Sequence, residues 1–427
     1  MMVETVDTLV VGAGQAGIAA SAHLSRRNIP HLVVEKDRVA ESWRSRRWDS
    51  LVANGPAWHD CFPGMTFPRS GPEAFPPKEE VADALKGFSE AHDAPIRTGV
   101  TVNSVVRAKG GSGFIIDTSQ GVIAAQNIIA ATGAFHHPVF PKIIPETAGV
   151  AQMHSATYRN PDQLAEGAVM VVGAGSSGGQ IADELQRAGR KVYLCVGPHD
   201  RPPRAYRGRD YCWWLGVLGL WDVAAKTPGT EHVTISVSGA RGGETVDFRK
   251  LAHGGMTLLG RASGYQDGRL LIDDDLADNI AAGDANYLDM LTQADTYIDQ
   301  YGLDLPKEPE AHELPCDPDC LTLPLREVDL AKAGITTVIW ATGYSQDFSW
   351  IDLPNACDAA GAPHHQRGVS PEPGLYYLGL PWQSRRGSTF IWGVWHDASH
   401  VADQIEIQRN YREYRPEPAM KRDPCHE

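Results

Sequence analysis

Paired cysteines are scarce in this 427-residue sequence. Its seven cysteines are odd in number and no two of them form a Cys-x-x-Cys motif; they are Cys61, Cys195, Cys212, Cys316, Cys320, Cys357 and Cys425. This spacing argues against a disulfide framework and against a dithiol redox centre. We interpret the nearest pair, Cys316 and Cys320, as two thiols in a proline-containing loop. We therefore expect no bound metal and a reducing, cytoplasmic setting.

Membrane-spanning and leader segments are also lacking. The stretch from Tyr211 to Trp221 is uncharged for eleven residues, which is too short to cross a bilayer. We expect it to form a core or interface helix, with an apolar lid over a substrate as the less favoured alternative. Because the first predicted strand begins about five residues from the start, we expect no signal peptide. The sequence thus predicts no insertion into membranes.

Positive charge is the third shortage. Lysine and arginine number 39 against 53 aspartate and glutamate residues, so the formal net charge is −14. Such a chain is repelled by polyanions, which argues against nucleic acid and anionic membrane surfaces as partners. An acidic substrate would need a local basic patch. We expect a small-molecule substrate instead, and a homodimer is compatible with the sequence.

A glycine-rich turn between an apolar strand and a helix opens the chain. The strand is expected at Asp7 to Val11 and the helix at Gln15 to Arg27. In such a turn Gly12 permits the sharp bend, Gly14 lets a diphosphate approach the backbone, and Gly17 lets the helix pack closely on the strand. The helix N-terminus then faces the anion. This arrangement predicts a dinucleotide site.

An acidic residue supports the same prediction. The apolar run from His31 to Val34 ends at Glu35, which lies 23 residues after Gly12. A carboxylate at about this distance binds the ribose hydroxyls of a dinucleotide in the Rossmann fold. The sequence therefore contains all four parts of a dinucleotide-binding unit: a strand, a helix, a second strand and an acidic residue.

A second glycine-rich turn follows the apolar strand Ala168 to Val172, and a helix is expected from Gly179 to Ala188. The position equivalent to Glu35 is Val196, and the next loop carries four arginines: Arg201, Arg204, Arg207 and Arg209. Arginines chelate a phosphate through charge-assisted hydrogen bonds worth about 1.5–3 kcal/mol each. We therefore predict that this site prefers NADP over NAD; a solvated loop is the alternative.

Two apolar strands that end in Ala-Thr-Gly mark the places where the chain passes between the two nucleotide units. They lead into Thr132 and Gly133, and into Thr342 and Gly343. We predict an α/β protein with two Rossmann-like domains of the glutathione-reductase type, the NADP domain being inserted in the FAD domain. The predicted limits are 1–158 for the first FAD part, 159–335 for the NADP domain with a helical insertion, 336–410 for the FAD return segment, and 411–427 for a tail.

The segment from Glu41 to Leu51 combines two tryptophans with three arginines. It is either a solvated basic turn or a wall of the cofactor site. The following turn, which contains Asn54, precedes Pro56 and breaks regular structure.

Together these motifs resemble the class B flavin-dependent monooxygenases. The two glycine turns lie 161 residues apart, and the resemblance also rests on Trp43, Ser50-Leu51, the two Ala-Thr-Gly turns and the linker His154 to Tyr158. The chain is most similar to the branch of flavin-containing N- and S-oxygenases, YUCCA-type enzymes and bacterial CzcO-like flavoproteins. It departs from the N-oxygenase linker pattern at Ala148 and Val150, where phenylalanine and glycine are expected.

The resemblance implies that FAD binds the first turn, with Glu35 on the adenosine ribose and with Trp43 and Leu51 lining the flavin. It implies that Asn54 lies beside the reacting edge of the flavin, and that Arg201 or Arg204 lies near the 2′-phosphate of NADPH. The expected cofactor contacts in the two turns are Gly12, Gly14, Gln15, Ala16, Gly17, Gly173, Gly175, Ser176, Ser177 and Gly178. Further expected contacts are Lys36, Ser42, Thr132, Gly133, Thr342, Gly343 and Trp395.

The implied activity is reduction of FAD by NADPH, reaction with O2, and oxygen transfer from a C4a-hydroperoxyflavin to a small organic substrate at nitrogen or sulfur. Asn54 is the candidate hydrogen-bond donor beside the peroxide, and a cap on the turn before Pro56 is its alternative role. Baeyer–Villiger oxidation, NADPH-dependent reduction without oxygen transfer, and a non-catalytic flavoprotein remain alternatives.

Overall fold

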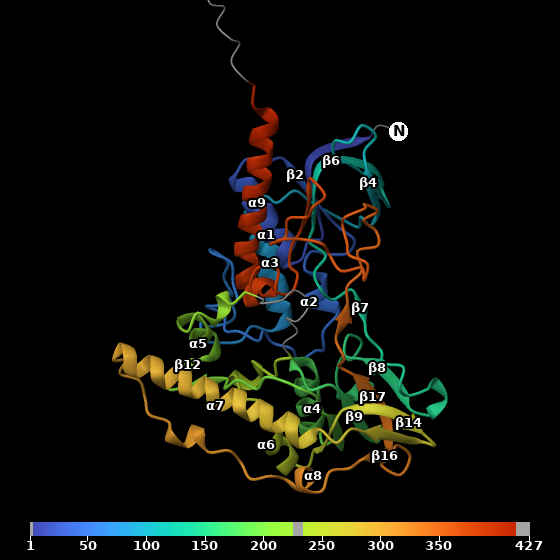
Figure 1. Ribbon diagram of the computed structural model, residues 1–427, viewed down its shortest axis with the longest axis vertical. Helices are drawn as coiled ribbons and strands as arrows, with labels where there is room; N and C mark the ends of the chain where they lie inside the picture. Colours follow the sequence, from blue (N-terminus) through green and yellow to red (C-terminus); the bar gives the residue numbers. More distant parts are fainter. Residues whose placement is uncertain (1–2, 225–233, 416–427) are drawn as a thin grey trace, which may run out of the picture.

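The computed structural model describes residues 3–224 and 234–415 of the chain. Its strands form two main sheets that lie one above the other along the long axis of the molecule (Figure 1). The upper sheet is accompanied by helices from both ends of the chain, and the lower sheet by helices from its middle. None of the described helices is long and apolar enough to cross a membrane.

The upper sheet has seven strands in the order β3-β2-β1-β6-β5-β4, with β19 paired to β6. Strands β1, β2, β3, β6 and β19 run parallel, while β4 and β5 add an antiparallel extension. Their bounds are β1 Glu4–Val11, β2 His31–Glu35, β3 Ile96–Thr98, β4 Val102–Arg107, β5 Phe114–Thr118, β6 Gly121–Ala130 and β19 Leu375–Tyr377.

Both faces of this sheet are buried. Val10 and Val33 face α1 (Gln15–Arg26), α3 (Lys78–Ala91) and α9 (Ile391–Glu413). Their neighbours in the strands, such as Leu9 and Val34, face the second apolar cluster, which includes Phe348. Burial on both faces explains why β1 and β2 are nearly continuous apolar runs rather than alternating ones.

The lower sheet has five parallel strands in the order β13-β10-β9-β17-β8. Their bounds are β8 Ala151–His154, β9 Ala168–Val172, β10 Val192–Cys195, β13 Thr257–Leu259 and β17 Ile335–Trp340. One face packs on α4 (Ser176–Arg187), α6 (Phe248–His253) and the start of α7 (Leu276–Tyr301). The other face packs on a small antiparallel sheet of β14 (Ala262–Gln266), β15 (Arg269–Ile272) and β16 (Glu327–Asp329).

All strands of the lower sheet fall between β6 and β19 in the sequence, so the chain leaves the upper sheet once and returns once. The two crossings lie side by side, because β7 (His137–Pro138) pairs with β18 (Tyr344–Ser345). His154, in the linker, is fully buried and its Nε2 lies 3.0 Å from the carbonyl oxygen of Gly343. This histidine therefore ties the two crossings together.

The remaining short elements are α2 (Glu41–Ser45), β11 (Ala205–Tyr206), β12 (Arg209–Asp210), α5 (Tyr211–Val217) and α8 (Asp319–Thr322). The predicted core or interface helix at Tyr211 to Trp221 is confirmed for Tyr211–Val217, where Trp214 is fully buried against α7; the α-helix ends before Leu218. α7 begins at Leu276, and Leu276 and Ile280 belong to its buried face. α9 continues to Glu413, past the predicted start of the tail, and residues 416–427 lie outside the described part.

Candidate functional site

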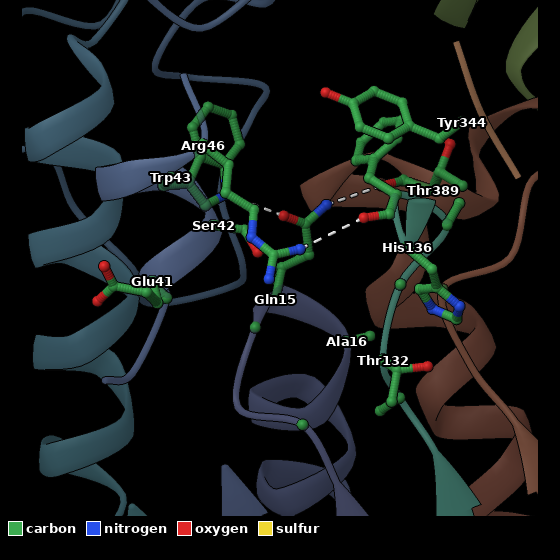
Figure 2. Close-up of a pocket in the computed structure, with 18 of the residues that line it drawn as sticks. Gln15, Ala16, Glu41, Ser42, Trp43, Arg46, Thr132, His136, Tyr344 and Thr389 are labelled. Atoms are coloured by element: carbon green, nitrogen blue, oxygen red, sulfur yellow. Dashed lines mark hydrogen bonds between the residues drawn. The ribbon is translucent and has the colours of Figure 1, made fainter. Parts of the chain in front are cut away.

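A cavity of about 630 Å³ lies where the two sheets meet. Its wall is formed by the first glycine-rich turn, the α2 segment (residues 40–48), the 131–137 loop, the start of α4, and residues 389–391 at the start of α9. Figure 2 shows part of this wall. Ligand pockets in proteins usually measure about 300–1,000 Å³. The cavity therefore has the size of a ligand site, and segments from both sheets line it.

The three glycines of the first turn have the geometry that the sequence predicts. Gly12 has φ of +106°, and a Cβ placed on it would lie 2.7 Å from the carbonyl oxygen of Ala131. A Cβ on Gly17 would lie only 1.8 Å from the Gly12 carbonyl oxygen, so α1 packs directly on the turn. A Cβ on Gly14 would meet no atom within 4 Å, and Gly14 lines the cavity. Of the three glycines, Gly14 is therefore the one with open space at its Cβ position.

Glu35 is held rigidly at the edge of the cavity. One carboxylate oxygen accepts a hydrogen bond from the amide of Ala13 at 2.7 Å, and the other accepts one from the amide of Asp37 at 2.9 Å. Lys36 lines the same part of the wall. A carboxylate oriented in this way retains lone pairs for ribose hydroxyls.

Gln15 reaches across the upper part of the cavity (Figure 2). Its Nε2 donates to the carbonyl oxygen of Thr389 at 2.7 Å, and its Oε1 accepts from the indole Nε1 of Trp43 at 3.1 Å. These bonds fix the indole as part of the wall. Ala16, Ser42, Leu51, Thr132 and Gly133 line the cavity as well.

Asn54 lines the cavity and is held from the opposite half of the molecule. Its Oδ1 accepts a hydrogen bond at 2.9 Å from Nε2 of Gln180 on α4, and its carbonyl oxygen accepts one from the Arg204 guanidinium. Asp60 caps the turn, because its Oδ2 accepts from the Gly55 amide at 3.0 Å. The Asn54 side chain is therefore not needed as the cap.

The second glycine turn has the same backbone conformation as the first, but other residues cover its middle glycine. Gly173 has φ of +105°, and a Cβ on Gly178 would lie 1.8 Å from the Gly173 carbonyl oxygen. A Cβ on Gly175, however, would lie 3.1 Å from Cγ2 of Thr234. The Ser176 hydroxyl donates to the carbonyl oxygen of Ile235 at 2.7 Å. Residues 234–238 thus lie across the start of α4.

Of the expected contacts in this second turn, Ser176 and Ser177 line the cavity, while Gly173, Gly175 and Gly178 do not. Thr342 and Gly343 also do not line the cavity. They lie where the chain returns to the upper sheet, and the Thr342 hydroxyl donates to the Val139 carbonyl oxygen. The next residue, Tyr344, does line the cavity (Figure 2).

Arg201 and Arg204 are buried and already paired with carboxylates. Arg201 contacts Asp284 at 2.7 Å, and Arg204 contacts Asp210 through two hydrogen bonds of 2.6 and 3.1 Å. Neither arginine lines the cavity. A contact with a 2′-phosphate stays a prediction, and it requires these ion pairs to open.

Trp395 lies away from the cavity, contrary to our expectation of a cofactor contact. Its ring stands 4.2 Å from that of His23 and 5.1 Å from that of Phe62, within the core between α9 and α1. Helical spacing puts it on the same buried face of α9 as Ile391 and Ala398. Packing in the core, rather than contact with a ligand, therefore explains why a large aromatic side chain stands at this position.

Two arginines of the α2 segment add positive charge to the cavity wall. Among the described residues, Arg46 and Arg47 have no carboxylate within ion-pair distance, and both line the cavity. Burial lowers the pKa of the Arg47 guanidinium, which also lies over the Phe135 ring. Burial likewise lowers the pKa of His136, so this histidine is neutral at pH 7. The positive charge of the wall therefore comes from these two arginines and from Lys36.

Sequence reasoning missed Gln180, Tyr344 and Phe390, all of which line the cavity. Gln180 follows directly on the second glycine turn, and its place near the start of α4 was the one available signal. Its partner Asn54 lies 126 residues earlier, which no local pattern reveals. No cluster of metal-ligating side chains occurs among the residues that the structure describes.

The chain is similar to several known proteins. The family model described as pyridine nucleotide-disulphide oxidoreductase matches residues 9–207. A CzcO-like oxidoreductase of Geobacillus kaustophilus is 34% identical over 95% of this chain and 99% of its own length. Indole-3-pyruvate monooxygenase YUCCA1 of rice (Oryza sativa subsp. japonica) is 32% identical over 44% of this chain and 47% of its own.

Among solved structures, the flavin-containing monooxygenase of Stenotrophomonas maltophilia has a similar fold. The TM-score is 0.65 at 19% identity, and the match covers 95% of this chain and 99% of the other. At this identity the likeness concerns the fold alone.

Proposed function

Because the chain belongs to the family of CzcO-like oxidoreductases, we propose that it is an NADPH- and FAD-dependent monooxygenase that oxygenates a small organic substrate at nitrogen or sulfur. The observation that carries the proposal is the shared cavity. The open turn at Gly14, the Asn54 amide and the start of α4 at Ser176 all line it. Two dinucleotides bound at such turns would meet in one enclosed space.

The upper half of the cavity fits FAD. The open backbone at Gly14 would take the diphosphate at the N-terminus of α1, and Glu35 would bind the adenosine ribose. Trp43 and Leu51 would contact the flavin. The upper sheet with α1, α3 and α9 would then form the FAD domain; the predicted limits 1–158 and 336–410 are too wide, because β8 and β17 belong to the lower sheet. When bound, FAD supplies the chemistry of oxygen activation and transfer.

The lower half, with the five-stranded sheet and its helices as its domain, would bind NADPH. Ser176 and Ser177 at the start of α4 would hold its diphosphate, since helix N-termini favour anions. Arg46 and Arg47 offer the free positive charge that Arg201 and Arg204 lack in this arrangement. They are therefore candidates for further phosphate contacts.

The chain itself would orient the reactants, exclude water and donate hydrogen bonds. Trp43, Leu51 and Phe390 give the cavity apolar walls, which keep water from the reacting centre. Asn54 would donate from Nδ2 to the oxygen that is being transferred. Its Oδ1 is already engaged with Gln180, so the amide is preorganised.

The matching family is described as pyridine nucleotide-disulphide oxidoreductase, but the activity of a thiol-disulfide reductase has less support. None of the described cysteines lines the cavity. A flavin reductase without oxygen transfer and a Baeyer–Villiger oxygenase are distinguished from the proposal by their products.

The test is to load the purified protein with FAD, add NADPH under ¹⁸O2, and screen amines, sulfides, indoles and ketones. We expect one group of amines or sulfides to accelerate NADPH oxidation and to yield an N- or S-oxide that carries ¹⁸O. Labelled esters from ketones would indicate Baeyer–Villiger oxidation. If all NADPH consumption appears as H2O2 across the panel, the oxygenase proposal fails.

A further inference from the structure

Gln180 occupies a position that nucleotide binding alone does not explain. It lies in the first two turns of α4, and its Nε2 has two partners. One is the backbone carbonyl oxygen of Val237 at 2.6 Å, and the other is Oδ1 of Asn54 at 2.9 Å. The side chain therefore joins the start of α4 to the turn that carries Asn54.

The two partners define how both amides are oriented. A backbone carbonyl only accepts hydrogen bonds, so the Gln180 atom that faces Val237 must be the NH2 group. The second hydrogen of this group points to Asn54, which must then present its oxygen. The two contacts therefore determine which end of each amide is oxygen and which is nitrogen. Atomic positions alone often do not give this assignment.

With its oxygen engaged, Asn54 turns its NH2 group away from Gln180. Among the described residues this NH2 group has no hydrogen-bond partner, and Asn54 lines the cavity. A reversed amide would present the oxygen to the cavity instead and would repel an electron-rich atom there. The direction of one amide therefore decides whether the cavity receives a donor or an acceptor.

We infer that Gln180 is a positioning residue that sets the direction of the Asn54 amide, so that the NH2 group faces the reacting atoms. The inference rests on the proposed function for the role of the donor, but the orientation itself does not depend on oxygen transfer. Because Gln180 belongs to α4, it also links the NADPH half of the cavity to the donor in the FAD half.

A purely structural role is the competing explanation. Gln180 would then serve only to fasten Val237 to α4, and Asn54 would be an incidental partner. The two explanations differ in what happens when Asn54 is absent. A positioning residue has no further effect on product formation once Asn54 is removed, whereas a structural residue has the same effect in either background.

Q180E and Q180M form the matched pair of variants. Q180E keeps the length of the side chain but replaces the donor by a carboxylate, which accepts from the Asn54 NH2 group and so reverses that amide. Both variants lose the bond to the Val237 carbonyl, so the difference between them reports on the Asn54 amide. Q180M has a similar length and no strong hydrogen bonds, so the Asn54 amide is free to take either direction. N54A and the double variant N54A/Q180E complete a double-mutant cycle.

The measured quantity is the fraction of NADPH that ends in oxygenated product rather than in H2O2, in the FAD-loaded full chain. We expect Q180E to lower the ratio of oxygenated product to H2O2 about tenfold, which corresponds to about 1.4 kcal/mol between the two competing barriers, and Q180M to lower it less. Lowering the pH should restore part of the loss in Q180E, because a protonated carboxyl group donates again. N54A/Q180E should equal N54A.

The visible absorption of bound oxidised FAD provides a readout that needs no turnover. We expect N54A and Q180E to shift the flavin bands from their wild-type positions, with no added shift in the double variant. If the wild-type protein binds FAD but forms no oxygenated product, the proposed function fails while this readout still decides the orientation. Equal losses from Q180E with and without Asn54, or wild-type flavin bands in Q180E, would overturn the inference.

Discussion

Alanine substitutions at Gly14 and Gly17 should separate ligand binding from packing within one turn. A Cβ on Gly14 has no atom within 4 Å, and the residue has an extended backbone with φ of −82° that alanine adopts without strain. Replacing glycine by alanine at such a position stabilises a protein by about 0.4–1 kcal/mol. Gly14 is also the N-cap of α1, where alanine is less favourable by a similar amount. We therefore expect G14A to change the free energy of unfolding by less than about 0.5 kcal/mol.

The same methyl group would stand where a diphosphate must approach the helix N-terminus. Loss of one charge-assisted hydrogen bond costs about 1.5–3 kcal/mol, which corresponds to an increase of about 10- to 150-fold in the Kd for FAD. G14A is thus expected to fold normally and to bind FAD poorly.

Gly17 should behave in the opposite way. Its Cβ would lie 1.8 Å from the Gly12 carbonyl oxygen, whereas ordinary contacts begin at 3.4 Å. The helix would have to move away from the strand, at a cost of about 4 kcal/mol or more. G17A is therefore expected to lower the free energy of unfolding strongly.

Urea unfolding of the FAD-free proteins and FAD titration followed by fluorescence quenching measure the two effects separately. The reasoning is refuted if G14A binds FAD as tightly as the wild-type protein, because the open backbone at Gly14 would then not be the diphosphate cradle. It is also refuted if both variants lose the same amount of stability.

Three further results are expected. N54A should retain FAD and oxidise NADPH but release H2O2 in place of product, as a peroxide assay and product analysis would show; undiminished product would exclude Asn54 as the donor. T234A removes the methyl group that lies 3.1 Å from the Cβ position of Gly175, so the Kd for NADPH should fall several-fold in fluorescence titration, and an unchanged Kd would mean that this methyl group does not obstruct the turn. Burial lowers the pKa of His23 to about 4 from 6.5; the unfolded chain then binds a proton more readily, so stability should fall by about 3 kcal/mol as the pH drops from 6.5 to 4. H23Q should flatten this loss in urea titrations at both pH values, and an equal loss in H23Q would rule out His23 as its source.

Features that depend on short stretches of chain could be predicted from the sequence. The bend at Gly12, the open backbone at Gly14 and the close packing at Gly17 follow from one strand, one turn and one helix. The order of the strands in both sheets agrees with the predicted insertion of one unit between β6 and β19. Glu35 lies at the cavity because it ends the second parallel strand, next to the first turn.

Features that depend on distant partners could not be predicted. The charge of Arg201 suggested a phosphate contact, but Asp284 lies 83 residues further along the chain and neutralises that charge in the structure. The family resemblance suggested that Trp395 contacts a cofactor, yet the packing of α9 on α1 turns its side chain into the core. The cover that Thr234 forms over Gly175 also arises from a segment 59 residues away.

The central claim is that one cavity brings two dinucleotides together so that electrons pass from NADPH to FAD and then to O2. The most direct measurement is to purify the protein with FAD, mix it with NADPH without oxygen while following the flavin absorption, and then admit ¹⁸O2 with an accepting amine or sulfide. We predict loss of the flavin absorption on mixing and one ¹⁸O atom in each product molecule. A protein that does not retain FAD, or a flavin that NADPH leaves oxidised, would contradict the account.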